Sequence, residues 1–104
     1  MSILERINNT PTRDDHDVFV KALKWRETIE RLDELTEYHG EALATLEPFF
    51  KAVRAGNVEW DRDGTMTIRC RSPRVAEVVA GILTLRDWVA FGNTFNMLVT
   101  VSRP

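Results

Sequence analysis

Apolar residues between Asp14 and Glu41 recur at intervals of three and four positions. The repeating set is Val18, Ala22, Trp25, Ile29 and Leu32. Because residues at these intervals share one side of an α-helix, the pattern predicts a single long amphipathic helix over 14–41 whose apolar side packs against a core. Aspartates at its start and Gly40 near its end agree with these bounds, since acids are favoured at helix N-termini and glycine terminates helices.

A second helical stretch runs from Ala42 to Ala55. Pro48 lacks a backbone N–H and is poorly tolerated inside a helix, but it suits the first turn of one. We therefore expect a break near 45–47, followed by a short helix that Gly56 terminates.

The apolar period changes to two between Asn57 and Arg71, which is typical of strands. The turn signal Arg62-Asp63-Gly64 in the middle predicts a β-hairpin. A last helix is predicted to begin at Ser72-Pro73, with serine as the N-cap, and to end at Gly92. Its expected buried stripe is Val75, Val78, Val79, Ile82, Leu85 and Val89. Alternating apolar residues over 95–102 then predict a third strand.

The chain is therefore predicted to be one α+β domain over 1–104. A short N-terminal segment (1–13) precedes a helical part (14–56) with one long helix, and a β-β-α-β part (57–104) forms a three-stranded sheet packed on the helices. A right-handed crossover would make the third strand parallel to the second, and we expect it beside the first.

Five glutamates form a second pattern on the long helix, which we call the acidic ridge: Glu27, Glu30, Glu34, Glu37 and Glu41. Neighbouring like charges on a helix repel, so the pattern has an energetic cost. Three interpretations stay open: a solvated face, a surface that docks a basic partner or imitates nucleic acid, and a metal site. The last is disfavoured because hard cations need converging ligands.

Phe19 and Leu23 are predicted on the side of the acidic ridge, away from the main apolar pattern, and need a cover. The candidates are Ile3, Leu4 and Ile7 folding back, a partner protein, or a second copy of the chain.

Charge is unevenly distributed along the 104 residues, whose total is −2. Residues 14–47 carry ten acids and four bases (net −6), and 48–104 carry five acids and eight bases (net +3). This predicts an acidic side and a mildly basic side. Cys70 is the only cysteine, residues 1–13 lack the long apolar core of a secretory signal, and no apolar run approaches the ~20 residues of a transmembrane helix. These features favour a cytoplasmic protein without a membrane partner.

Reactive side chains are few. His16 lies in an Asp-Asp-His-Asp motif at a helix start, where consecutive side chains fan out, and His39 lies near a helix end, where the dipole favours a cation. Cys70 belongs to the alternating apolar set of its strand, as a buried residue would. Asp61–Gly64 resembles part of a calcium loop, but its glycine falls at the fourth position instead of the sixth. We therefore predict no enzyme activity, no metal and no cofactor.

The sequence thus favours a non-enzymatic protein-binding module, of adaptor or inhibitor type, that docks through its acidic long helix. A phage or mobile-element origin fits the small size, although no motif supports it. Aromatic and other apolar residues contribute most at protein interfaces. The predicted partner-binding residues are therefore the acidic ridge together with Phe19, Leu23, Trp25 and Trp88.

Two alternatives remain at this level. The first is nucleic-acid binding through a basic patch, whose members are Arg62, Arg69, Arg71 and Arg74. Against it, Trp60 and Phe95 are predicted on apolar faces and not on an open sheet face, where bases could stack. The second is a structural homo-oligomer, such as a dimer, in which these arginines pair with the acidic ridge of another copy.

Overall fold

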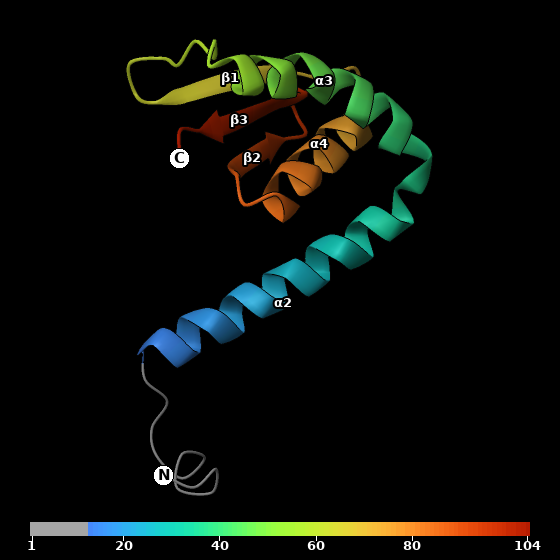
Figure 1. Cartoon of the computed structure of the whole chain (residues 1–104). Coiled ribbons are helices and arrows are strands. Elements are labelled where there is room, and N and C mark those ends of the chain that lie inside the picture. Colours follow the sequence, from blue (N-terminus) through green and yellow to red (C-terminus); the bar gives the residue numbers. More distant parts are fainter. Residues whose placement is uncertain (1–12) are drawn as a thin grey trace, which may run out of the picture.

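The computed structural model describes residues 13–104, with side chains from His16 onward. Its helices are α2 (Arg13–Glu34), the short 3₁₀ helix η1 (Thr36–Tyr38), α3 (His39–Ala55) and α4 (Pro73–Leu85). Its strands are β1 (Thr65–Arg69), β2 (Val89–Asn93) and β3 (Leu98–Ser102) (Figure 1). The predicted α+β class, with helices first and a three-stranded sheet after them, is confirmed. Along the chain the sheet part runs β-α-β-β instead of the expected β-β-α-β.

The sheet has the order β1-β3-β2, and both pairings are antiparallel. The expected parallel third strand is therefore wrong. So is its expected place beside residues 57–61, because these residues form no strand. Only a tight turn remains of the predicted hairpin, in which the Asp61 N–H donates to the Thr65 carbonyl at 2.7 Å.

Strand β2 occupies residues that were predicted to be the end of the last helix. Helix α4 stops early because Asp87 adopts the left-handed conformation, with a φ of 65°. The Asp87 N–H then donates to the Thr84 carbonyl, and the Trp88 N–H to the Leu83 carbonyl, at 3.1 and 3.0 Å. This pairing is a Schellman ending, which glycine usually provides. With aspartate in that place, the sequence signal was absent.

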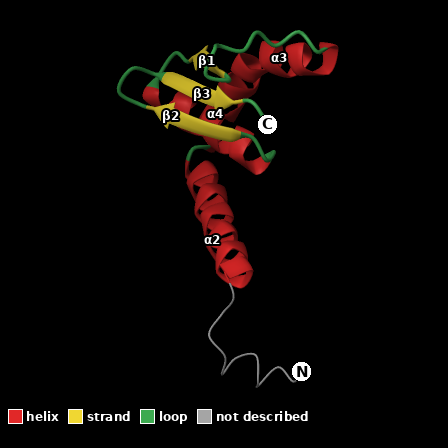
Figure 2. Ribbon diagram, turned by 90° about the vertical axis from the view of Figure 1, so that its left-hand side faces the viewer, coloured by secondary structure: helices red, strands yellow, loops and turns green. Residues whose placement is uncertain are grey.

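Helix α4 and one face of the sheet form the centre of the core. Val75, Val78, Val79 and Leu83 on α4, and Val99 and Val101 on β3, have no exposed surface. The predicted start of α4 is confirmed, since the Ser72 Oγ accepts from the Val75 N–H at 3.2 Å. The other face of the sheet is not covered by α4, which lies behind the strands in Figure 2.

The helical part bends at Leu35, and neither of the predicted breaks occurs. Gly40 lies in the first turn of α3, and Pro48 lies inside that helix. Helix α4 packs against both α2 and α3. The thirteen residues of α4 span only about 20 Å. If α2 and α3 formed one straight helix, α4 would be too short to contact both of them. The His39 side chain supports the bend by donating from Nε2 to the Leu32 carbonyl at 3.0 Å.

Packing explains why Pro48 does not end α3. Ala42, Leu46 and Phe49 are spaced by four and three, and all are buried. Proline inside a helix costs about 3 kcal/mol. A break before Pro48 would separate these three side chains, whose burial contributes about 1.5–3 kcal/mol for each large residue. Gly56 does end α3 in the left-handed conformation, as predicted. None of the described helices is long and apolar enough to cross a membrane.

Replacing Gly40 with alanine is expected to raise the free energy of unfolding by about 0.5–1 kcal/mol, because alanine is the better helix residue. A Cβ at Gly40 would meet nothing within 4 Å. Thermal and urea unfolding would measure the change. A loss of stability would instead indicate the helix-terminating conformation that the sequence suggested.

Candidate docking surface on helix α2

Helix α2 contacts the rest of the domain along one side. Leu32 of α2 packs tightly against Gly81 of α4, since a Cβ added at Gly81 would lie 2.8 Å from Leu32 Cδ2. Toward the N-terminus, Lys21 Nζ still lies 3.9 Å from Asp87 Oδ1, just past the end of α4. Beyond this point α2 extends away from the sheet and from α4 (Figures 1 and 2).

Four large apolar side chains of α2 are exposed, and we call them the outward apolar face. Their exposed fractions are 69% for Val18, 62% for Phe19, 43% for Leu23 and 46% for Ile29. At 100° per residue, Phe19 and Leu23 lie opposite the side of Leu32 that packs on α4. Polar α2 residues such as Glu27 and Thr28 instead line a cleft of about 390 Å³ against α4. The helix therefore turns much of its apolar surface away from its own domain.

This orientation corrects the predicted apolar side of α2. Of its five predicted core residues, Leu32 is buried and Trp25 is half-buried, while Val18, Ala22 and Ile29 are exposed. Apolar residues occupy most of the circumference of α2, so periodicity alone did not decide which side faces the core. The expectation that Ile3, Leu4 and Ile7 cover Phe19 and Leu23 lies outside the described residues.

The acidic ridge is not one continuous row, because α2 ends at Glu34. Glu37 lies in η1 and Glu41 in α3. Two members are neutralised by ion pairs: Glu30 with Arg26 at 3.6 Å, and Glu34 with Arg31 at 2.8 Å. Within residues 16–104, Glu27, Glu37 and Glu41 make no ion pair, and all three are exposed. The prediction of a single acidic surface on one helix is therefore wrong.

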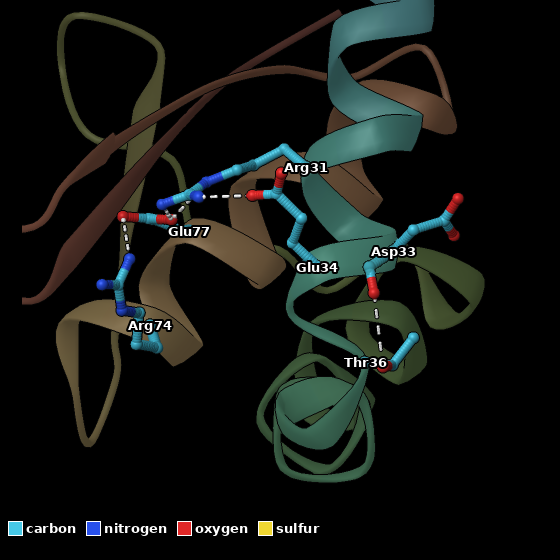
Figure 3. A network of polar contacts seen from close by, with 6 residues as sticks. All are labelled: Arg31, Asp33, Glu34, Thr36, Arg74 and Glu77. Carbon is cyan, nitrogen blue, oxygen red and sulfur yellow. Dashed lines mark hydrogen bonds and ion pairs between the residues drawn. The ribbon is translucent and has the colours of Figure 1, made fainter.

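Arg31 joins α2 to α4 through a polar network (Figure 3). Its Nη2 lies 2.8 Å from Glu77 Oε2, and its Nε donates to the same oxygen at 3.1 Å. Arg74 Nη1 lies 3.5 Å from Glu77 Oε1. The hydrogen bond to Glu34, followed in size of effect by the hydrogen bond to Glu77, raises the pKa of the Arg31 guanidinium. In this network only the Arg31–Glu77 pair joins the two helices. Glu34, a predicted partner-binding residue, pairs with Arg31 within α2, and Arg74, a predicted nucleic-acid-binding residue, pairs with Glu77 within α4.

Trp88 lies in an aromatic cluster. Its ring meets Phe49 edge-on, with centroids 5.1 Å apart, and stacks on Trp60 at 6.4 Å. The side chain is half-buried. Packing within the domain therefore accounts for Trp88.

The face of the sheet opposite α4 carries an exposed aromatic ring and a basic side chain, Phe91 and Arg69. We call it the open sheet face, and the register places on it Thr65, Thr67, Arg69, Val89, Phe91, Asn93, Leu98, Thr100 and Ser102. Phe91 is 68% exposed, and Phe95 in the following turn is 96% exposed. The sequence missed Phe91 because its residues were assigned to a helix. The expected absence of an aromatic residue from this face is therefore wrong.

The remaining candidate residues are dispersed. Arg69 lies on the open sheet face, while Arg62 and Arg71 are exposed in the loops on either side of β1. His16 is exposed on α2, and burial raises the pKa of the Cys70 thiol. In the part of the chain that the structure describes, no three His, Cys, Asp or Glu side chains are grouped as a metal site requires.

No protein-family model, curated protein or solved structure matches this chain.

Proposed function

We propose that this protein is a non-enzymatic protein-binding module, and that the outward apolar face of α2 is its docking surface. The observation that carries the proposal is the exposure of Phe19 and Leu23 on the side of α2 opposite Leu32, which packs on α4, with Val18 and Ile29 exposed on the flank. Phe19 and Leu23 have the i, i+4 spacing of the anchors through which amphipathic helices dock into apolar grooves. The partner would present an apolar groove about 17 Å long, the length of α2 from Val18 to Ile29.

The charges of α2 would help to orient the partner without supplying most of the binding energy. Exposed ion pairs contribute little to affinity, whereas buried aromatic and large apolar anchors dominate it. Arg26 and Glu30 lie among the apolar anchors and already pair with each other. The proposed docking surface on α2 is therefore apolar, whereas the sequence alone favoured an acidic docking surface on the same helix.

Replacing both Phe19 and Leu23 with aspartate is expected to abolish recovery of a partner from a lysate of the source cells. Both side chains are exposed, so the variant should keep the fold, which circular dichroism would check. Leu43→Asp is the matched control, because Leu43 is 47% exposed on α3, away from this face. Equal recovery with the double variant and the control would contradict the proposal.

A charge reversal separates the apolar and acidic interpretations. Glu37→Lys with Glu41→Lys removes acidic residues that are exposed and outside the Arg31 network. We expect partner recovery to persist in this variant. Its loss, with recovery kept by the Phe19 and Leu23 variant, would restore the acidic docking surface.

Nucleic-acid binding is a second candidate, favoured by one specific observation. Phe91 and Arg69 share the open sheet face, which combines an exposed ring for base stacking with a cation for a phosphate. Against it, Arg69 is the only basic residue of that face. Titration with single-stranded RNA and DNA at low salt would test it, and no binding there would exclude it.

A further inference from the structure

Two surfaces of this chain lack an apolar cover within the described residues: the outward apolar face of α2 and the open sheet face. We propose that the protein forms a twofold-symmetric dimer in which the outward apolar face of α2 in each copy lies across the open sheet face of the other. The inference rests on the proposed function, because it uses the same docking surface of α2 and names a second copy as the partner.

Helix α2 cannot cover the open sheet face of its own chain. Leu32 and Arg31 hold α2 against Gly81 and Glu77 of α4. Helix α4 covers the opposite face of the sheet, with Ala76 and Ala80 against Gly92. The sheet therefore separates α2 from the open face of the same chain, so the outward apolar face of α2 can meet an open sheet face only in another copy.

The two surfaces match in the order of their apolar and charged groups. On α2, the exposed Phe19 and Leu23 come first, and residues 26–34 follow with four acids and two bases, of which Arg26 would yield its partner Glu30 to Arg69 of the other copy. On the open sheet face, Val89 and Phe91 lie on one edge strand, and Arg69 lies on the other edge. None of the nine residues of that face is acidic. Apolar groups can thus meet apolar groups while acids meet a base.

The spacing of these groups agrees as well. From strand separation and rise, the Cα atoms of Phe91 and Arg69 should lie about 12 Å apart. On the helix, Leu23 and Glu30 are separated by about 10.5 Å along the axis. Placing Leu23 over Phe91, with α2 running diagonally across the strands, therefore brings Glu30 to Arg69.

Twofold symmetry makes the modest size of each surface sufficient. In such a dimer the helix–sheet contact occurs twice. Stable interfaces bury about 1,600 Å² in total, so each contact needs only about half of that area. Phe19 and Leu23 are exposed to another copy, and the part of α2 before Lys21 extends past the end of α4 in Figure 1.

Sedimentation of the full chain over a range of concentrations would test the proposal. We expect the native chain to dimerise, and Phe19→Asp and Phe91→Asp each to raise the dimer dissociation constant about thirtyfold or more, as loss of an interface hot spot does. Leu43→Asp should leave the constant unchanged. Arg69→Glu should weaken the dimer, and adding Glu30→Lys should restore part of the affinity.

Mixing the two phenylalanine variants gives the sharpest outcome. A mixed dimer keeps one intact contact, between Phe19 of the Phe91→Asp chain and Phe91 of the Phe19→Asp chain. We therefore expect the mixture to dimerise more strongly than either variant alone. Pairing of α2 with α2 would be insensitive to Phe91→Asp, and pairing of β2 with β2 would be insensitive to Phe19→Asp. Either result would overturn the proposal.

Failure of this inference can be told from failure of the proposed function. If the native chain stays monomeric at the highest soluble concentration, the dimer is wrong. If Phe19→Asp with Leu23→Asp still abolishes partner recovery in that case, the docking surface stands and its partner is another protein. If Phe91→Asp abolishes RNA binding without changing the oligomeric state, the open sheet face binds nucleic acid, and the dimer is again wrong.

Discussion

Replacing Leu46 with alanine is expected to lower the free energy of unfolding by about 2–5 kcal/mol, the cost of removing a large side chain from a packed core. Leu46 has no exposed surface and lies between Ala42 and Phe49 on the buried stripe of α3. This stripe exists only if α3 continues through Pro48. Urea unfolding followed by circular dichroism would measure the loss.

Leu43 provides the matched control for this experiment. It is the same residue type on the same helix, three positions earlier, but it is 47% exposed. Leu43→Ala should change the free energy of unfolding by less than about 0.5 kcal/mol, as surface substitutions usually do. Similar losses at Leu43 and Leu46 would mean that α3 is rotated or broken near the proline, as the sequence alone suggested.

Replacing Gly92 with valine is expected to cost about 1–3 kcal/mol through overpacking. A Cβ at Gly92 would lie 3.2 Å from Ala80 Cβ and 3.4 Å from the Ala76 carbonyl oxygen. The second contact is with backbone, which cannot move aside as a flexible side chain can. The substitution should therefore separate α4 from β2, even though valine is otherwise the better strand residue.

Two further variants isolate this effect. Thr67→Val introduces the same β-branched residue on the open sheet face and should be nearly neutral, because Thr67 is exposed. Adding Ala80→Gly to Gly92→Val should recover part of the lost stability if the two Cβ atoms are in contact, as a double-mutant cycle measures. A stabilising Gly92→Val would place residues 89–93 away from α4, as a continued helix would require.

Local signals were interpreted correctly wherever the deciding interactions lie within a few residues. The Ser72 cap and the Gly56 ending of α3 depend only on their immediate neighbours. Val75, Val78 and Val79 of the predicted stripe of α4 are buried, and so are the alternating residues Ile68, Val99 and Val101 of β1 and β3. Val89 and Phe95 were predicted on buried faces but are exposed, and Leu83 is buried without having been predicted. The open sheet face was not visible, since Phe91 was assigned to a helix that Asp87 ends without glycine.

By itself, the sequence determined the α+β class, most of the core side of α4 and the position of Phe19 and Leu23 away from the side of Leu32. Only the tertiary structure decided the bend at Leu35, the passage of α3 through Pro48 and the side of α2 that faces solvent. The physical reason is that α4 is short and both α2 and α3 pack against it. This shared packing bends the chain, keeps Leu46 and Phe49 in one stripe, and leaves the N-terminal half of α2 beyond the core.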